Sequence, residues 1–124
     1  MSKKPSAPSA SGKSAVPRPP YEDIAPALVD YTERVLFGDV WLRPGLGPRD
    51  RSLITVASLV SMYRTNELPF HLNRALDNGV TREELIELIT HLAFYSGWPT
   101  ANSAMTIAKR VFEERPSADD SARR

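Results

Sequence analysis

The sequence predicts an all-α protein, a compact bundle of about five to six helices, and three observations support that prediction. Apolar residues recur at spacings of three and four along successive segments. No segment shows a convincing strand pattern. Short connections rich in Pro and Gly separate the periodic segments, as in helical bundles. With 124 residues, of which 41% are hydrophobic, the chain has the size of one domain.

The first two helices are expected on either side of a loop rich in Gly and Pro. Residues 21–37 place apolar side chains at helical spacing, and Gly38 ends this helix. Residues 50–63 are apolar over a broad face. Such a helix is expected to be buried on most sides, either centrally or at a contact between subunits.

Three further helices follow with clearer end signals. The third is expected over residues 66–78, with Thr65 as its N-cap and Gly79 as its C-terminal stop. Thr81 and Glu84 form a capping box that begins the fourth. The break at residues 97–99 ends the fourth helix and begins the fifth.

The domain is expected to cover residues 21–115, between two polar tails. Residues 1–20 contain five Pro and five Ser, which predicts a disordered tail, and residues 116–124 are read as a flexible tail. Because residues 1–20 carry +4 and residues 116–124 carry zero, the total of +1 leaves −3 for the domain. An acidic domain argues against nucleic acid as a partner. The absence of a long apolar run argues against a membrane, so we expect a cytoplasmic protein.

Two histidines are the candidate proton carriers. Glu67 and His71 stand four residues apart on one predicted helix, where a carboxylate raises the pKa of a neighbouring imidazole and suits it to general acid catalysis. An ordinary helix-surface pair is the alternative. His91 lies among apolar residues, so it is either a second catalytic group or a hydrogen-bonded core histidine.

The candidate binding residues are basic or aromatic. Arg49 and Arg51 begin an apolar helix, where a cation is poorly placed for the helix dipole; they either grip a carboxylate or form salt bridges. Arg64 and Arg74 are further candidates. The turn that contains Tyr95, Trp98 and Asn102 is either a packed corner or the wall of a pocket, and Trp41 allows the same two interpretations.

Four segments, residues 49–59, 67–71, 75–84 and 95–102, together with Glu87 and His91, resemble the carboxymuconolactone decarboxylase family over about residues 25–113. The resemblance implies an alkylhydroperoxidase-like helical fold and a homo-oligomer, typically a trimer or hexamer. A redox branch of this family carries two cysteines at the positions of Arg64 and Glu67. Because this chain has no cysteine, thiol peroxidase activity is excluded.

The resemblance implies a cofactor-free and metal-free decarboxylase of aromatic-acid breakdown, which converts 4-carboxymuconolactone to an enol-lactone. In this interpretation His71 is the acid, and Glu67 adjusts its pKa. Arg51 binds a substrate carboxylate, and Arg49 and Arg64 are the alternative residues for that role. The remaining candidates are His91, Tyr95 and Asn102 as donors to a dienolate oxygen, and Trp98 as a pocket wall. The alternatives are another decarboxylation, isomerisation or ring-forming step on a small enolisable acid, and a non-enzymatic helical oligomer that binds a ligand.

Overall fold

Helices make up all the regular secondary structure of residues 18–115, the part of the chain that the computed structural model describes, which confirms the all-α prediction. Residues 1–17 of the tail expected over residues 1–20, and the tail expected at residues 116–124, lie outside the described residues. In chain order the elements are α1 (Pro26–Asp30), the π-helix η1 (Tyr31–Leu36), the 3-10 helix η2 (Val40–Leu42), α2 (Pro48–Ser61), α3 (Leu68–Asp77), α4 (Arg82–Ser96) and α5 (Trp98–Glu114).

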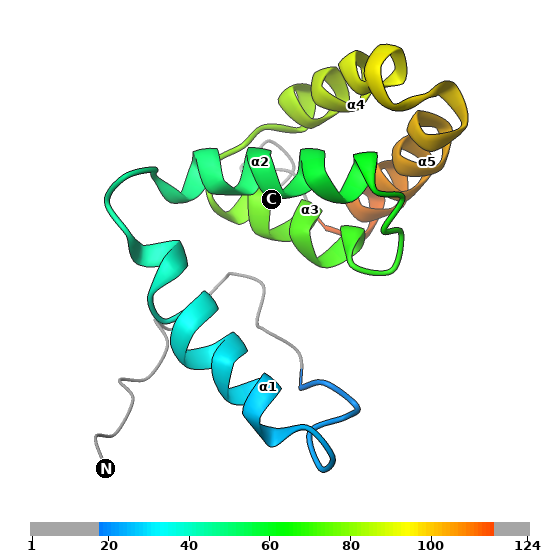
Figure 1. Ribbon diagram of the computed structural model, residues 1–124. Helices are drawn as coiled ribbons and strands as arrows, with labels where there is room; N and C mark the ends of the chain where they lie inside the picture. The colour runs from blue at the N-terminus through cyan, green and yellow to red at the C-terminus, as the bar shows by residue number, and fades with distance from the viewer. Residues whose placement is uncertain (1–17, 116–124) are drawn as a thin grey trace.

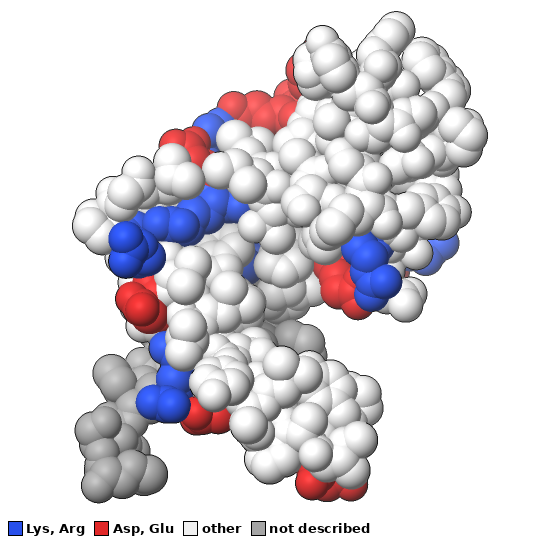
Figure 2. Space-filling view, in the orientation of Figure 1, with Lys and Arg blue, Asp and Glu red and all other residues white. Residues whose placement is uncertain are grey.

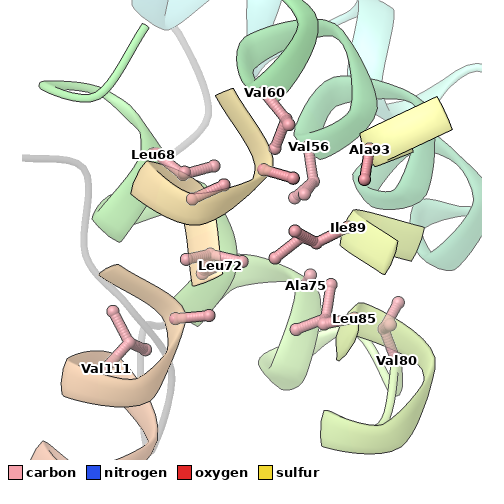
Figure 3. Packing of buried hydrophobic residues seen from close by; sticks show 13 residues of the cluster. Val56, Val60, Leu68, Leu72, Ala75, Val80, Leu85, Ile89, Ala93 and Val111 are labelled. Carbon is pink, nitrogen blue, oxygen red and sulfur yellow. The ribbon is translucent and has the colours of Figure 1, made fainter. Parts of the chain in front are cut away.

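Helices α2 to α5 enclose the core, and the segment 26–42, called here the N-terminal arm, projects from them (Figure 1). The buried side chains come from all four helices and interdigitate between them (Figure 3). Among the largest are Val56 and Val60 from α2, Leu68 and Leu72 from α3, and Leu85 and Ile89 from α4; α5 contributes mainly alanines and Val111. The small residues let α5 approach closely, so it packs against both α4 and α3.

The start of α4 agrees with the sequence-based prediction, whereas the start of α3 does not. The capping box is present: the Thr81 hydroxyl accepts from the Glu84 N–H, and the Glu84 carboxylate accepts from the Thr81 N–H. The N-cap assigned to Thr65 was wrong, because α3 begins at Leu68 with Glu67 in the cap position. A proline near the start of α3 sets its backbone angle and lacks the N–H that a first turn leaves unbonded.

The N-terminal arm differs from the single helix expected over residues 21–37. Helix α1 begins at Pro26 and continues into the wider turns of η1. Its apolar stripe faces away from the bundle: Ile24, just before the arm, is 82% exposed, and Leu28, Tyr31 and Val35 are exposed as well. On α2, Ile54 is exposed, so the apolar face of this helix is not all buried centrally, and its burial at a contact between subunits stays a prediction. Apolar faces therefore remain uncovered by residues 18–115.

Gly38 allows the turn that brings the arm back to the bundle. A Cβ atom there would lie 2.6 Å from the Arg34 carbonyl oxygen and 2.7 Å from that of Glu33, so no side chain fits against this backbone. Immediately after the turn, η2 presents Trp41, which is buried. The arm therefore contacts the bundle through η2, although α1 projects away from it.

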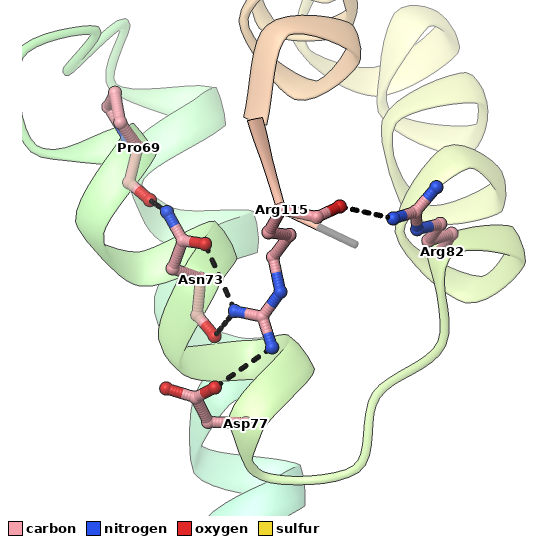
Figure 4. Close-up of polar contacts among 5 residues, drawn as sticks. All are labelled: Pro69, Asn73, Asp77, Arg82 and Arg115. Carbon is pink, nitrogen blue, oxygen red and sulfur yellow. Dashed lines mark hydrogen bonds and ion pairs between the residues drawn. The ribbon is translucent and has the colours of Figure 1, made fainter. Parts of the chain in front are cut away.

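The C-terminal end of α5 is tied to α3 and α4 by a polar network (Figure 4). The Arg115 guanidinium donates to the carbonyl and the side chain of Asn73 and, at 3.0 Å, to the Asp77 carboxylate. Arg82, at the start of α4, donates to the carbonyl oxygens of Phe112 and Arg115. Three helices are thus joined where the described chain ends.

The surface shows two contrasting regions. Basic side chains gather where the loop before α2 meets the bundle, whereas the end of the molecule formed by the α4–α5 corner is largely uncharged in this view (Figure 2). None of the helices in residues 18–115 is long and apolar enough to cross a membrane.

Candidate active site

His71 lies in the first turns of α3, where the N-terminal arm meets the bundle. Its ring stacks on Trp41 of η2, with centroids 6.2 Å apart and planes inclined by 18°. The adjacent Phe70 meets the imidazole edge-on at 5.0 Å. Because the core face of α3 is formed by Leu68, Leu72 and Ala75, His71 sits at the edge of the core and is half-buried.

Arg74 lies one turn further along α3 and adds a charge to this aromatic group. Its Cζ atom is 4.6 Å from the ring centroid of Phe37 and 4.7 Å from that of Trp41. Both distances are within the range of cation–π contacts. Phe37, Trp41, Phe70, His71 and Arg74 are called here the α3 cluster.

Two buried nitrogen atoms of the α3 cluster lack a hydrogen-bond partner within the described residues: Nδ1 of His71 and Nε of Arg74. A buried donor or acceptor left without a partner costs about 1–3 kcal/mol, so such atoms are uncommon. Two of them on neighbouring turns of one helix mark a place suited to a polar ligand. Residues 18–115 contain no group of three or more His, Asp or Glu side chains that could hold a metal ion.

The pKa of His71 is lowered from 6.5 to about 4. Burial is the main cause because it disfavours the charged imidazolium, and the positive charge of Arg74 acts in the same direction. The charge of Glu67 acts in the opposite direction but is the weakest of the three influences. Glu67 thus raises the pKa of His71 as expected, but the expected net result, a pKa above the usual value, was wrong because burial and Arg74 outweigh it. His71 is neutral at pH 7.

Glu67 is paired with Arg64. The Arg64 Nε and Nη2 atoms donate to the two carboxylate oxygens at 2.9 and 3.1 Å, which lowers the pKa of Glu67. Both side chains are exposed. Arg64 and Glu67 thus form a surface ion pair one turn before His71. Arg64, which was predicted as an alternative carboxylate anchor, already has a carboxylate partner.

Arg49 and Arg51 use their donors to hold the start of α2. Arg51 donates to the carbonyl oxygens of Leu46 and Arg43, each at 3.1 Å. Arg49 forms an ion pair with Glu84, the glutamate of the capping box at the start of α4. Both arginines therefore already donate to oxygen atoms of the protein, and their roles as anchors of a substrate carboxylate stay predictions.

His91 and the turn after it lie elsewhere on the bundle. The His91 ring stacks on Tyr95 at 4.8 Å, and Phe94 meets Trp98 edge-on at 5.1 Å. Tyr95 is 77% and Trp98 56% exposed, and Asn102 and His91 are exposed too. The possibility that His91 is a core histidine is therefore wrong.

This corner packs at the C-terminal end of α2, where Ser61 is hydrogen-bonded to Ser96. The loop that follows η2 is instead held by Arg51, in the first turn of α2. A helix of this length spans roughly 20 Å, so Arg51 and the corner that contains His91 lie at opposite ends of α2.

Sequence reasoning missed the importance of Phe37, Phe70 and Arg74. Arg74 follows His71 by three residues, so the two share one side of α3. Phe37 and Trp41 are four residues apart, but Gly38 between them hid their relation, since it breaks the regular helix. The i,i+3 spacing was the available signal for Arg74, and only the fold shows the aromatic rings against it.

The sequence profile of the "Carboxymuconolactone decarboxylase family" matches residues 26–110. A 4-carboxymuconolactone decarboxylase from Acinetobacter baylyi is 45% identical over 85 residues, 68% of this chain and 63% of that protein. A nitrosuccinic acid decarboxylase from Metarhizium robertsii is 36% identical over 78 residues, 63% of this chain and 54% of that protein. An uncharacterised 15.0 kDa protein from Paracoccus denitrificans is 27% identical over 95 residues, 75% of this chain and 71% of that protein. The match thus covers less than two thirds of the length of either decarboxylase.

Proposed function

The chain belongs to the carboxymuconolactone decarboxylase family, and from this premise we propose that it is a carboxy-lyase. Its proposed substrate is a small carboxylated lactone of the 4-carboxymuconolactone type, and its product is the enol-lactone. The relative that is 45% identical supports this substrate class. The observation that carries the proposal is the α3 cluster, where an imidazole and a guanidinium each keep a buried nitrogen without a partner in the described residues. The proposed location is the cytoplasm.

The proposed reaction needs no external electron acceptor. The bond between the departing carboxylate and the γ-carbon breaks, CO₂ leaves, and the electron pair passes through the C=C bond to the lactone carbonyl. A proton is then added to carbon, which restores the lactone carbonyl and leaves an enol-lactone. The protein has to orient the carboxylates, stabilise the developing negative oxygen and deliver that proton.

We assign proton delivery to His71. With a pKa of about 4, it carries a proton at pH 7 in roughly one molecule in a thousand. Substrate carboxylates entering the α3 cluster add negative charge beside the imidazole and raise its pKa, because an anion favours the protonated form. The acid form of His71 then builds up when substrate is bound.

The proposal is tested by following CO₂ release and enol-lactone formation from 4-carboxymuconolactone with the purified protein. His71→Gln keeps a polar side chain but cannot deliver the proton, so kcat is expected to fall by about 10²-fold or more. Thr106→Val, on the exposed side of α5, is the control and retains full activity. A wild-type protein that releases no CO₂ contradicts the proposed substrate. Full activity in His71→Gln together with loss in His91→Gln would transfer the role to His91.

A second candidate function is the decarboxylation of another small acid that stabilises its own carbanion. It is favoured by the relative whose name is nitrosuccinic acid decarboxylase. A nitro group accepts the electron pair left by CO₂ just as a conjugated lactone does. Relative kcat/KM values for nitrosuccinate and 4-carboxymuconolactone distinguish the two functions.

We also propose that the protein works as a homo-oligomer, a trimer or hexamer. Exposed apolar side chains on the N-terminal arm and at the α4–α5 corner support this assembly, because large exposed apolar surfaces mark interaction sites. Sedimentation equilibrium measures the mass directly. A monomer at micromolar concentration contradicts the proposal.

A further inference from the structure

The environment of Arg74 differs from that of the arginines singled out by sequence. Arg49, Arg51 and Arg64 each donate to a carboxylate or a carbonyl oxygen. The Cζ atom of Arg74 instead lies over the rings of Phe37 and Trp41, its Nε is buried without a hydrogen-bond partner in the described residues, and the charge of Asp77 acts on it. Arg74 therefore keeps a buried donor without an acceptor in the described residues, whereas each of the other three already donates to an oxygen atom.

The aromatic contacts supply no oxygen acceptor to the edge of the Arg74 guanidinium, along which a planar anion binds. A guanidinium is flat, and its N–H groups lie in its plane. Stacking on a ring uses the face of the guanidinium, whereas a carboxylate binds along its edge. Phe37 and Trp41 thus restrain the position of Arg74, whose Cζ lies over both rings, and offer it no oxygen acceptor. Little side-chain freedom is then lost when an anion binds.

The position of Arg74 relative to His71 makes this donor useful. The two residues are three apart on α3, and both contact Trp41. The charge of Arg74 is felt by the imidazole, since it is the second cause of the low pKa of His71. An anion bound at Arg74 thus lies close enough to His71 to interact with it.

We propose that Arg74 is the residue that binds a substrate carboxylate and holds the substrate beside His71. This inference rests on the proposed function for the identity of the ligand, a small unsaturated carboxylic acid. It replaces Arg51 as the anchor expected from the sequence, because the donors of Arg51 hold the loop between η2 and α2. It also explains how substrate activates the acid: the bound carboxylate cancels the positive charge that disfavours protonation of His71.

The first test is steady-state kinetics with 4-carboxymuconolactone. Arg74→Met keeps an unbranched, apolar side chain but removes the charge and the donors, so KM is expected to rise about 30-fold or more. Arg74→Lys keeps the charge but not the edge of the guanidinium, so its KM is expected to lie between those of the wild type and Arg74→Met. Arg110→Met, an exposed arginine on α5, is the matched control and is expected to stay within about twofold of wild type. Far-UV circular dichroism and a thermal melt establish that each variant is folded.

The result that overturns the inference is an unchanged KM in folded Arg74→Met. A rise in KM in Arg51→Met with none in Arg74→Met would return the anchor role to Arg51. Either outcome leaves the proposed function intact, because wild-type turnover is measured in the same assay.

The second test does not depend on turnover. Glutarate, an unreactive dicarboxylate, is titrated into the wild-type protein while the imidazole signals of His71 are followed by NMR over a range of pH. The pKa of His71 is expected to rise when glutarate binds, and to be higher in Arg74→Met without ligand than in the free wild-type protein. Glutarate should then have little further effect in Arg74→Met. An equal rise with glutarate in both proteins contradicts the anchor role, even if the lactone proves not to be the substrate.

Discussion

Three influences shift the pKa of His71, and they do not all act in the same direction. Burial against Trp41 and Phe70 and the charge of Arg74 both disfavour the protonated ring, whereas Glu67 favours it. Burial dominates because the carboxylate of Glu67 is exposed and already paired with Arg64. Solvent and Arg64 both weaken the electrostatic effect of the Glu67 carboxylate on the His71 imidazole. A favourable spacing on a helix therefore does not decide a pKa when the surroundings of the two groups differ.

The low pKa of His71 predicts a pH-dependent stability. The unfolded chain protonates this histidine as the pH falls through about 6.5, whereas the folded protein does so only near pH 4. Because the unfolded state binds more protons in this window, the free energy of unfolding is highest above about pH 6.5 and decreases down to about pH 4. Allowing for the partial exposure of the ring, the decrease is on the order of 1–2 kcal/mol.

Urea denaturation at a series of pH values measures this dependence. His71→Gln removes the titrating group, so its free energy of unfolding should change less between pH 6.5 and 4.5. His91→Gln keeps the wild-type profile, because His71 is still present. Parallel profiles for wild type and His71→Gln would refute the assignment of the titration to His71.

At the scale of the element, local backbone chemistry decides where α3 ends. The Val80 N–H donates to the Ala75 carbonyl and the Gly79 N–H to the Leu76 carbonyl, at 2.9 and 3.2 Å. This is the paired hydrogen bonding of a Schellman motif. Gly79 has a φ of 96° and thus occupies the left-handed region that glycine tolerates best. The sequence marks this stop correctly because the conformational requirement is local.

Gly79→Ala is expected to lower the free energy of unfolding by about 1–2 kcal/mol, since a Cβ atom is strained at this φ although nothing crowds it. Gly45→Ala is the matched control: its Cβ would also meet no atom within 4 Å, and Gly45 does not have a positive φ. Its stability should equal or slightly exceed that of wild type. The comparison needs only chemical denaturation midpoints, and an equal loss in both variants would argue against strain as the cause.

At the scale of the whole molecule, the bundle is joined by contacts between residues far apart in the chain. Arg115 reaches the Asp77 carboxylate, whose side chain is only 4% exposed, and Asn73 on the same helix. This network connects the end of α5 to α3, while Arg82 connects it to α4 (Figure 4). A nearly buried carboxylate depends strongly on its cation, because solvent cannot replace it.

Arg115→Met is therefore expected to lower the free energy of unfolding by about 2–3 kcal/mol. Lys109→Met is the control, since it breaks an exposed ion pair with Glu113 on α5, and such pairs contribute about 0–1 kcal/mol. Thermal and urea unfolding of both variants provide the measurement. A similar small loss in the two would mean that the network does not hold the bundle together.

The uncovered apolar faces also belong to this scale. The sequence predicted a broadly buried second helix, yet Ile54 and the stripe of the N-terminal arm are exposed in one chain. The periodicity of a helix shows which face is apolar, but it does not show whether the same chain or a second copy covers that face. The proposed assembly accounts for these faces and is tested by the mass measurement given above.

The sequence by itself determined the helical class, the apolar faces of the helices, the capping box of α4, the stop at Gly79 and the family. These features depend on periodicity, on the conformational needs of single residues, or on motifs read in order along the chain. They are local in sequence, so no knowledge of the packing is needed to predict them.

The tertiary structure alone decided the composition of the α3 cluster. Phe37 and Trp41 reach His71 and Arg74 only because the chain turns at Gly38 and folds η2 back against the bundle. The pairing of Glu67 with Arg64, and of Arg51 with loop carbonyls, likewise depends on which donors come within reach after folding. A pKa and a free donor are properties of three-dimensional surroundings, because burial and electrostatic fields arise from distances in space and not from separations along the chain.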